Sequence, residues 1–411
     1  MIDSVPDDMM KATRLTQAGR LVEATTLLQR LLRGGGLAGG SPARGSERAS
    51  IVELPFNDIA AKSNVLDVGL VTTEGPSSPD TTSQLLEPTH HVLRDLISGR
   101  SAGVLHGLLK PSTPPSKVVP TLGRFIAQSF ANEAGSRAYK LYIPSRYSNE
   151  PRPLIVMLHG CTQTPDDFAA GTQMNFVAEE QSCFVVYPEQ AVAANSSKCW
   201  NWFKSSDQKR GQGEPAIIAG ITRQVMSDYK IDARRIYIAG LSAGGAAASN
   251  VAEAYPDIYA AVGVHSGLAC GVARDLPSAF AAMQGHHPVP DPKGGRQAGV
   301  FNPLPTIVFH GDRDSTVHPR NGGEVIARAQ AGGEFKTVVE KGSLPGGRSY
   351  TRSIQRDASG RGLVEEWIIH GAGHAWSGGS TSGSFTDPKG PDATKEMLRF
   401  FLEHKLDSSK S

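Results

Sequence analysis

The chain has 411 residues, and its 42 Lys and Arg residues against 40 Asp and Glu residues leave a formal net charge of +2. This balance gives no excess of positive charge with which to bind nucleic acid or an anionic membrane surface. No apolar run reaches the ~18 residues of a membrane-spanning helix. The first residues are acidic and lack the basic and apolar regions of a secretory signal, which predicts a cytoplasmic protein.

Two segments of different character precede the main body of the chain. Apolar residues recur at helical spacing between residues 8 and 33, and Gly34-Gly35-Gly36 then ends the pattern. We expect an N-terminal amphipathic helical segment over residues 1–33. It would dock on the body or on another copy of the chain, or contact a partner or a granule surface. Residues 34–122 are rich in Gly, Ser, Pro and Thr, which predicts a mostly disordered linker.

From residue 123 to residue 411, short apolar runs alternate with helical patterns. The runs predict strands at 123–131, 137–143, 153–158, 183–187, 235–239, 260–264, 306–309 and 363–369. Helices are predicted at 165–181, 214–229, 244–255, 322–331 and 394–404. A turn signal at 357–360 predicts a hairpin. This alternation predicts one α/β domain with a mostly parallel central sheet flanked by helices.

The strongest chemical signal is the sequence Gly240-Leu241-Ser242-Ala243-Gly244, which lies between a predicted strand and a helix rich in small residues. Glycines on both sides allow a tight turn that exposes the serine hydroxyl at the edge of the sheet. The turn also directs the amides of a helix N-terminus toward that position, where they favour negative charge. We therefore expect Ser242 to be a nucleophile.

A serine nucleophile needs a base and an acid, which should follow in the order Ser, acid, His. His374 lies between small residues after the last predicted strand, which favours it as the general base. Asp312 and Asp314 both follow the 306–309 strand and compete for the acid role. We favour Asp314, because the chain needs a few residues to turn toward the histidine. Asp312 would then brace the loop, and His310 would bond backbone in its own turn.

An oxyanion hole needs two hydrogen-bond donors. The amide of Ala243, the residue after the nucleophile, should be one of them. The other should come from the loop His159-Gly160-Cys161-Thr162-Gln163, where Gly160 permits an amide to turn inward. We expect Cys161 to supply that amide, with Thr162 as the second candidate.

Aromatic residues and cysteines gather near the same predicted edge. Trp200, Trp202 and Trp376 would either line a substrate pocket or pack as core. The four cysteines are Cys161, Cys183, Cys199 and Cys270, and we expect free buried thiols, with one disulfide as the alternative. A Cys161–Cys199 bridge fits one sheet edge, but cytoplasmic conditions argue against it. No metal cluster and no nucleotide-binding motif is visible, so we expect no metal and no cofactor.

Several motifs together resemble the poly(3-hydroxybutyrate) depolymerase family of esterases. They are Leu158-His-Gly-Cys-Thr-Gln163, Tyr187-Pro-Glu-Gln190, Cys199-Trp-Asn-Trp-Phe203, Gly213-Glu-Pro-Ala216, Gly240-Leu-Ser-Ala-Gly-Gly245, Val264-His-Ser-Gly267, Gly371-x-Gly-His-x-Trp376 and Asp387-Pro388. The resemblance covers about residues 125–405. It implies an α/β-hydrolase fold and a triad of Ser242, Asp314 and His374.

The expected function is a serine carboxylesterase that acts on short-acyl or hydroxyalkanoate esters. The resemblance leaves a feruloyl or acetylxylan type of esterase as the alternative. A serine peptidase is disfavoured, because no propeller and no charged peptide pocket is visible. The alternative from another class is a non-catalytic hydrolase-like module that binds granules or a partner through its N-terminal helix.

Overall fold

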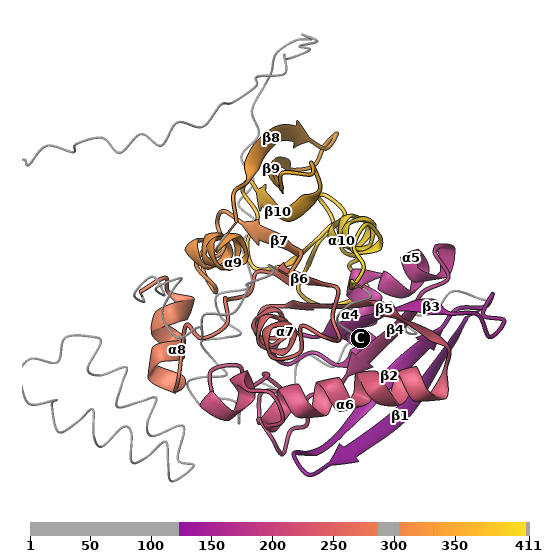
Figure 1. The fold of residues 1–411 in the computed structure, drawn as a ribbon. Helices are drawn as coiled ribbons and strands as arrows, with labels where there is room; N and C mark the ends of the chain where they lie inside the picture. Colours follow the sequence, from indigo (N-terminus) through magenta and orange to yellow (C-terminus); the bar gives the residue numbers. More distant parts are fainter. Residues whose placement is uncertain (1–122, 287–303, 332, 408–411) are drawn as a thin grey trace, which may run out of the picture. The chain divides into compact units, whose positions relative to one another are not determined.

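The computed structural model describes residues 123–286, 304–331 and 333–407, all within one compact unit (Figure 1). The helix and linker expected before residue 123, and any granule or subunit contact through that helix, lie outside the described residues. Within the described part, no helix combines the length and the apolar character needed to span a bilayer.

Ten of the described strands form one mixed sheet in the order β1-β2-β4-β3-β5-β6-β7-β10-β9-β8. The central strands from β4 to β10 run parallel to one another, and the pairs toward both edges are antiparallel. The strands are β1 (Arg124–Asn132), β2 (Gly135–Ile143), β3 (Arg152–Leu158), β4 (Phe184–Pro188), β5 (Ile231–Leu241), β6 (Ala261–His265), β7 (Thr306–Gly311), β8 (Lys336–Ser343), β9 (Ser349–Arg356) and β10 (Gly362–Ile369). Strands β4, β6 and β7 are buried throughout, as expected of apolar runs covered on both faces.

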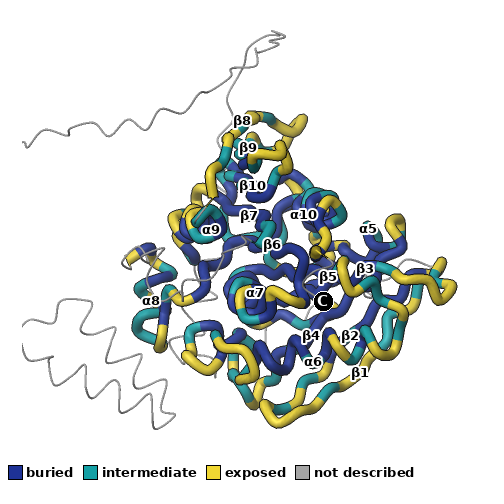
Figure 2. The backbone as a smooth tube through the Cα atoms, viewed as in Figure 1, coloured by how far each residue is buried: buried dark blue, intermediate teal, exposed yellow. Residues whose placement is uncertain are grey.

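Helices cover both faces of the sheet, and each face has its own apolar core (Figures 1 and 2). One core includes residues of α6, α7 and α9, and the other includes residues of α4, α5 and α10. The helices are α4 (Pro165–Thr172), α5 (Met174–Glu180), α6 (Gly213–Asp228), α7 (Ala243–Ala254), α8 (Leu276–Met283), α9 (Arg320–Gln330) and α10 (Ala393–Leu402), with a 3-10 turn η1 at Ser205–Gln208. Two short strands, β11 (Trp376–Ser377) and β12 (Thr386–Asp387), pair in parallel outside the main sheet.

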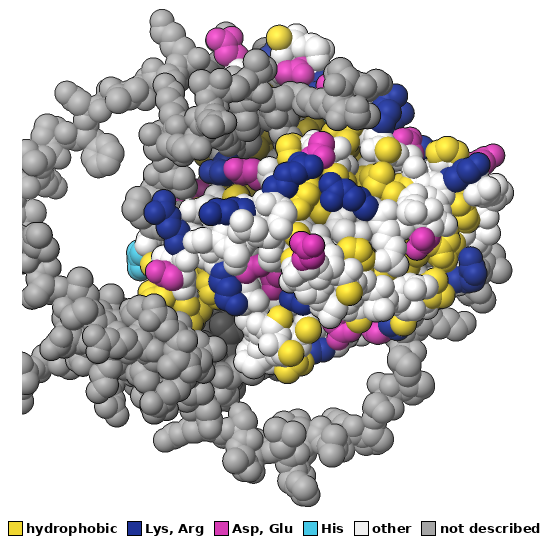
Figure 3. Space-filling view, turned by 60° about the horizontal axis from the view of Figure 1, so that its bottom comes forward, with side chains coloured by type: hydrophobic (Ala, Val, Ile, Leu, Met, Phe, Trp, Pro, Cys, Tyr) yellow, Lys and Arg dark blue, Asp and Glu magenta, His cyan; other side chains and the backbone are white. Residues whose placement is uncertain are grey.

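The predicted fold class is confirmed, with local differences. The single helix expected at 165–181 is two helices, because Gln173 between them adopts a left-handed conformation with φ of 56°. The hairpin expected at 357–360 connects β9 to β10, and Gly360 supplies the positive φ of its turn. Strand β8 and helix α8 were not predicted. On the face that Figure 3 shows, basic and acidic side chains are interspersed, in agreement with the balanced charge of the sequence.

Candidate active site

The parallel strands place the three candidate triad residues along one edge of the sheet. Ser242 follows β5, Asp314 lies in the loop after β7, and His374 lies in the loop after β10. Strands β5, β6, β7 and β10 are consecutive and parallel, so these loops leave the same carboxyl edge. Ligands of open α/β sheets collect at this edge.

Ser242 occupies a strained turn between β5 and α7. Its φ of 58° and ψ of −121° lie outside the regions that side chains other than glycine favour. The turn is tight enough that a Cβ on Gly244 would lie 2.1 Å from the carbonyl oxygen of Leu158. A Cβ on Gly240 would lie 2.3 Å from the backbone of Gly244. The glycines of the motif are therefore required by the close approach of β5, α7 and the end of β3.

His374 and Asp314 form a direct hydrogen bond, with 2.7 Å between Nδ1 and Oδ2. The second carboxylate oxygen of Asp314 accepts the amides of Thr316 and Val317, each at 2.9 Å. Burial raises the pKa of Asp314, but the electrostatic interaction with His374 and hydrogen bonds from His310 and His374 outweigh burial and lower the pKa well below its ordinary value. The carboxylate therefore stays ionised and holds the imidazole by Nδ1. Among the described residues, Nε2 of His374 has no hydrogen-bond partner, so it is the ring nitrogen available to accept a proton.

The neighbouring polar residues of these loops have other partners. Asp312 contacts Nδ1 of His370 at 2.9 Å and accepts the Gly371 amide at 2.7 Å, so it braces the loop that carries His374. Nε2 of His310 donates to the carbonyl oxygen of Val317 at 2.8 Å and also lies 3.5 Å from Oδ2 of Asp314. Both arrangements match the supporting roles predicted for Asp312 and His310.

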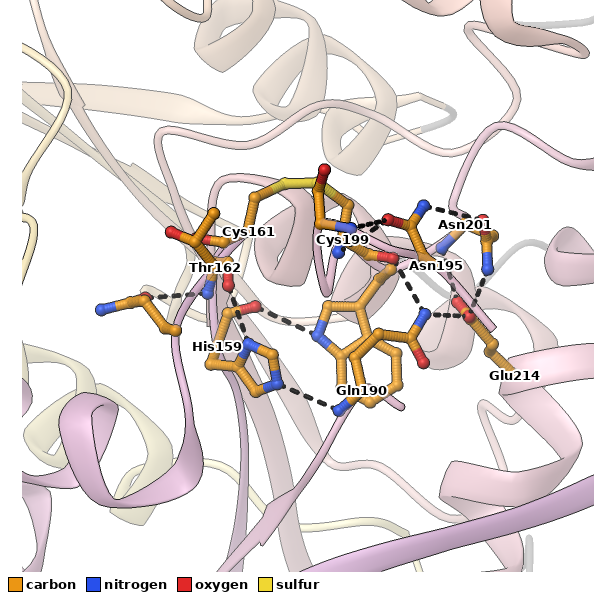
Figure 4. The surroundings of a disulfide bond; sticks show 12 residues. His159, Cys161, Thr162, Gln190, Asn195, Cys199, Asn201 and Glu214 are labelled. Atoms are coloured by element: carbon orange, nitrogen blue, oxygen red, sulfur yellow. Dashed lines mark hydrogen bonds between the residues drawn. A yellow bond between two sulfur atoms is a disulfide. The ribbon is translucent and has the colours of Figure 1, made fainter. Parts of the chain in front are cut away.

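The loop after β3 has one amide that differs from its neighbours (Figure 4). The Gly160 amide donates to Oε1 of Gln163 at 2.9 Å, and the Thr162 amide donates to the Ser197 carbonyl at 2.8 Å. The amide of Cys161 has no acceptor within the described part of the chain. Thr162, the second candidate donor, is thereby engaged elsewhere, and the free donor in the loop is Cys161.

The sulfur atoms of Cys161 and Cys199 are joined in a disulfide, which corrects the expectation of free thiols at these two positions (Figure 4). The two loops meet because β3 and β4 are neighbouring parallel strands, so the segments that follow them leave the same edge. The prediction was wrong because it rested on the compartment rather than on the position of the loops. Cys183 is a buried thiol, and burial raises its pKa to about 12.

We expect loss of the Cys161–Cys199 bridge to destabilise the fold. The bridge closes a loop of 38 residues, for which a chain-entropy model gives a contribution of about 4 kcal/mol. Urea unfolding of the C161S/C199S double variant should show this loss in the free energy of unfolding. Dithiothreitol should lower the stability of the wild type and leave the double variant unchanged. Equal stability of the oxidised wild type and the double variant would contradict the prediction.

Glu214, at the start of α6, organises the segment around Cys199 and was not predicted as a functional residue. Its buried carboxylate accepts from Nε2 of Gln190 at 2.5 Å and from the amide and side chain of Asn201 at 2.7 and 2.9 Å. Burial raises the pKa of Glu214, and the nearby carboxylate of Asp207 acts in the same direction. A buried carboxylate with several donors fixes backbone, so Glu214 holds the bridged segment against the sheet (Figure 4).

The three tryptophans considered for the substrate pocket are buried. Trp200 and Trp376 are 0% and 1% exposed, and Trp202 is 6% exposed. The indole of Trp200 donates to the His159 carbonyl at 3.0 Å, and that of Trp376 donates to Oγ1 of Thr394 at 2.9 Å. These positions favour the second of the two interpretations, in which the tryptophans pack as core beneath the loops.

We expect acid to destabilise the protein through His159. Its Nδ1 contacts the Gly160 carbonyl at 2.7 Å, and its Nε2 accepts the Gln190 amide at 3.1 Å, which requires the neutral ring. Burial lowers the pKa of His159 from 6.5 to about 4. The unfolded chain therefore takes up the proton first, and stability that is present above pH 6.5 is lost as the pH falls toward 4. The loss should be about 3 kcal/mol.

This pH dependence can be measured as urea unfolding at pH 7.5, 5.5 and 4.5. Burial also lowers the pKa values of His265 and His404, so these two rings add to the loss of stability in acid. In an H159Q variant, the free energy of unfolding should therefore fall less steeply with decreasing pH than in the wild type, but it should still fall. An unchanged slope in H159Q would show that His159 does not contribute.

A mostly parallel sheet with helices on both faces, and with a serine in a sharp turn after the central strand β5, defines an α/β-hydrolase. Residues 137–335 match the sequence model of the family described as esterase PHB depolymerase. Over these residues, which are just under half of the 411-residue chain, the sequence is similar to that family.

Individual relatives agree with the assignment. The region is similar to poly(3-hydroxyalkanoate) depolymerase C of Paucimonas lemoignei, with 32% identity over 252 residues that cover 60% of this chain and 60% of the relative. Feruloyl esterase B of Thermothelomyces thermophilus is 28% identical over 248 residues, which cover 57% of this chain and 82% of the relative. The acetyl xylan esterase from Aspergillus awamori has a similar fold, with a TM-score of 0.54, 18% identity and coverage of 68% of this chain and 99% of that one.

The match to the depolymerases is partial in length. The chain spans 60% of the Paucimonas lemoignei relative and 49% of a poly(3-hydroxybutyrate) depolymerase of Ralstonia pickettii.

Proposed function

We propose that this protein is a serine carboxylesterase in which Ser242, His374 and Asp314 form the catalytic triad. The observation that carries the proposal is the 2.7 Å hydrogen bond between His374 and Asp314 at the carboxyl edge where the Ser242 turn also lies. A hydrogen-bonded imidazole and carboxylate on the same sheet edge as a strained serine turn is the arrangement that acyl transfer needs.

The reaction proceeds through an acyl-enzyme. Oγ of Ser242 attacks the ester carbonyl, and its proton passes to Nε2 of His374. The carbonyl electrons move onto oxygen, and their return breaks the bond to the alcohol, which leaves with the proton from His374. Water then attacks the acyl-serine with the same base, and the acid product and the free serine are released. Asp314 holds the ring and stabilises the imidazolium in both halves of the cycle.

The amides of Ala243 and Cys161 are the proposed oxyanion donors. Ala243 is the first residue of α7, so its amide has no intrahelical acceptor. The Cys161 amide is the free donor in a loop whose neighbouring amides are engaged. The disulfide and the indole of Trp200 tie this loop to the segment after β4, so the donor is fixed before substrate arrives. Preorganised donors of this kind contribute on the order of 3 kcal/mol each.

The substrate class is proposed from the relatives. Two of them are named as depolymerases of poly(3-hydroxyalkanoate) or poly(3-hydroxybutyrate), and others are named as feruloyl and acetylxylan esterases. All of these names describe the cleavage of carboxylic esters. We therefore favour short-acyl or hydroxyalkanoate esters, with a feruloyl or acetylxylan substrate as the alternative.

A fluorophosphonate probe tests the proposed chemistry against a non-catalytic module. The full chain should gain one covalent adduct, and peptide mass spectrometry should locate it at Ser242. Prior binding of a hydrolysable ester should slow the labelling. A chain that gains no adduct at Ser242 and hydrolyses no ester would be a binding module instead.

A hydrolysis panel separates the substrate classes. It should contain p-nitrophenyl esters of increasing chain length, 3-hydroxybutyrate oligomers, amorphous polyester and methyl ferulate. We expect kcat/KM to be highest for the short-acyl and 3-hydroxybutyrate members. A clear preference for methyl ferulate would move the assignment to the feruloyl type.

The cytoplasmic location stays a prediction from the sequence. The Cys161–Cys199 bridge counts against it, because structural disulfides persist mainly in oxidising compartments. Alkylation of the protein in its native cells, followed by mass spectrometry of the two cysteines, tests the location through the redox state.

A further inference from the structure

We propose that His265 is a positioning residue that connects the Ser242 turn to the segment that carries His374. This inference rests on the proposed function, because it concerns the geometry of the same triad. His265 is the last residue of β6, the strand that lies between β5 and β7. Its backbone and its ring each form one of the two connections.

The backbone of His265 fixes the nucleophile turn. Its carbonyl oxygen accepts the amide of Ser242 at 2.9 Å, and it is paired in register with Leu241, the residue before the serine. The strained φ of Ser242 therefore depends directly on the end of β6.

The ring of His265 fixes the segment that follows the proposed base. Its Nε2 accepts the amide of Ser377 at 2.9 Å, three residues after His374. Because Nε2 accepts a hydrogen bond, the ring proton lies on Nδ1, which contacts Oγ of Ser266 at 3.2 Å. Burial holds the pKa of His265 well below its ordinary value, so Nε2 keeps its lone pair under the conditions of an esterase assay.

Aromatic neighbours leave the ring no freedom to turn. It stacks on Trp376 with 5.0 Å between ring centroids, and on Phe309 with 5.8 Å. Trp376 lies two residues after His374, so the stack and the hydrogen bond restrain the same segment. His265 is fully buried, which excludes contact with a substrate and limits its role to positioning.

Loss of the ring acceptor should misplace His374 without removing any triad group. The Ser377 amide is buried, and an unpaired buried amide makes a segment rearrange. Displacement of a catalytic group by about 1 Å can reduce turnover by 10²-fold. We therefore expect an effect on kcat, whereas KM should change little because no substrate contact is lost.

Three substitutions separate the roles of acceptor and ring. H265F and H265L remove the acceptor with two different side-chain shapes, and H265Q keeps an acceptor oxygen. Turnover is measured with p-nitrophenyl butyrate and expressed per active site, with sites counted by fluorophosphonate titration so that unfolded protein does not contribute. We expect kcat per site to fall about 10- to 100-fold in H265F and H265L, and H265Q to recover most of the loss. KM should stay within about threefold of the wild type throughout.

The matched control is His404, another buried histidine, which follows α10 and whose ring nitrogens contact the backbone carbonyls of Phe400 in α10 and Gly362 in β10. H404Q should lower the thermal midpoint and leave kcat per site unchanged. The inference is overturned if folded H265F or H265L keeps the wild-type kcat per site, or if H265Q is as impaired as they are. Failure of the proposed function is a separate result, because the wild type would then not be labelled at Ser242.

Discussion

The S242A variant should lose about 10⁴-fold or more in kcat for p-nitrophenyl butyrate while its thermal midpoint stays within a few degrees of the wild type. The loss follows because alanine has no atom that can form the acyl-enzyme, and water must then attack the ester directly. Stability should change little, because both residues have a Cβ and meet the same strain at a φ of 58°. The measurement is initial-rate hydrolysis together with thermal unfolding of the same preparation.

A serine in the same helix provides the matched control. Ser249 is partly buried in α7, and within the described part of the chain its Oγ donates to the Gly245 carbonyl alone, at 3.2 Å. S249A should retain activity within about twofold. If S242A hydrolyses the ester at the wild-type rate, or if both variants lose activity equally, Ser242 is not the nucleophile.

The elements of the site that the sequence predicted are those that depend on local pattern. A buried parallel strand appears as an apolar run, and its carboxyl end can be located within a residue or two. Ser242, Asp314 and His374 each follow such a run, so the sequence itself predicts that they lie along one edge of the sheet. The preference for Asp314 over Asp312 rested on the length of chain needed to turn, and the structure pairs Asp314 with His374 and Asp312 with His370.

The features that the sequence did not predict depend on contacts between distant segments. The sequence allowed a Cys161–Cys199 bridge at one sheet edge, but the compartment argument disfavoured it, and the adjacency of β3 and β4 is what shows that the two loops meet. Glu214 stood in one of the family-like motifs and at the start of a helical pattern, but neither reveals that its partners Gln190 and Asn201 lie in the segment between β4 and η1. Pattern also could not decide whether tryptophans near the edge face a substrate or the core, because both positions favour large aromatic side chains.

The helix break at Gln173 and the edge strand β8 were missed for different reasons. Gln173 is neither glycine nor proline, and it lies within a continuous helical pattern, so the sequence did not indicate its left-handed conformation. Strand β8 is mostly exposed, so it lacks the apolar alternation that marks a half-buried strand. Strand β8 forms through its antiparallel pairing with β9, which its own residues do not signal.

The D314N variant should lose about 10³- to 10⁴-fold in kcat with little change in KM. Asparagine can still accept the amides of Thr316 and Val317 through its oxygen. Its Nδ2 would then replace the carboxylate oxygen that lies 2.7 Å from Nδ1 of His374. Because an amide nitrogen donates, Nδ1 of His374 would have to accept that hydrogen bond. The ring proton moves to Nε2, which can no longer take the proton of Ser242. The imidazolium also loses the negative charge that stabilises it.

Asp312 is the comparison for this variant, because it lies in the same loop and also contacts a histidine. D312N should cost less than about tenfold, since Asp312 only braces the loop through His370 and Gly371. The two variants are compared by kcat per active site from pH 6 to pH 9, with the active sites counted by fluorophosphonate titration. Because the pKa of Asp314 is held well below its ordinary value, protonation of this carboxylate should not limit activity anywhere in that range. A D312N loss equal to or larger than that of D314N would transfer the acid role to Asp312 and leave Asp314 as a loop brace.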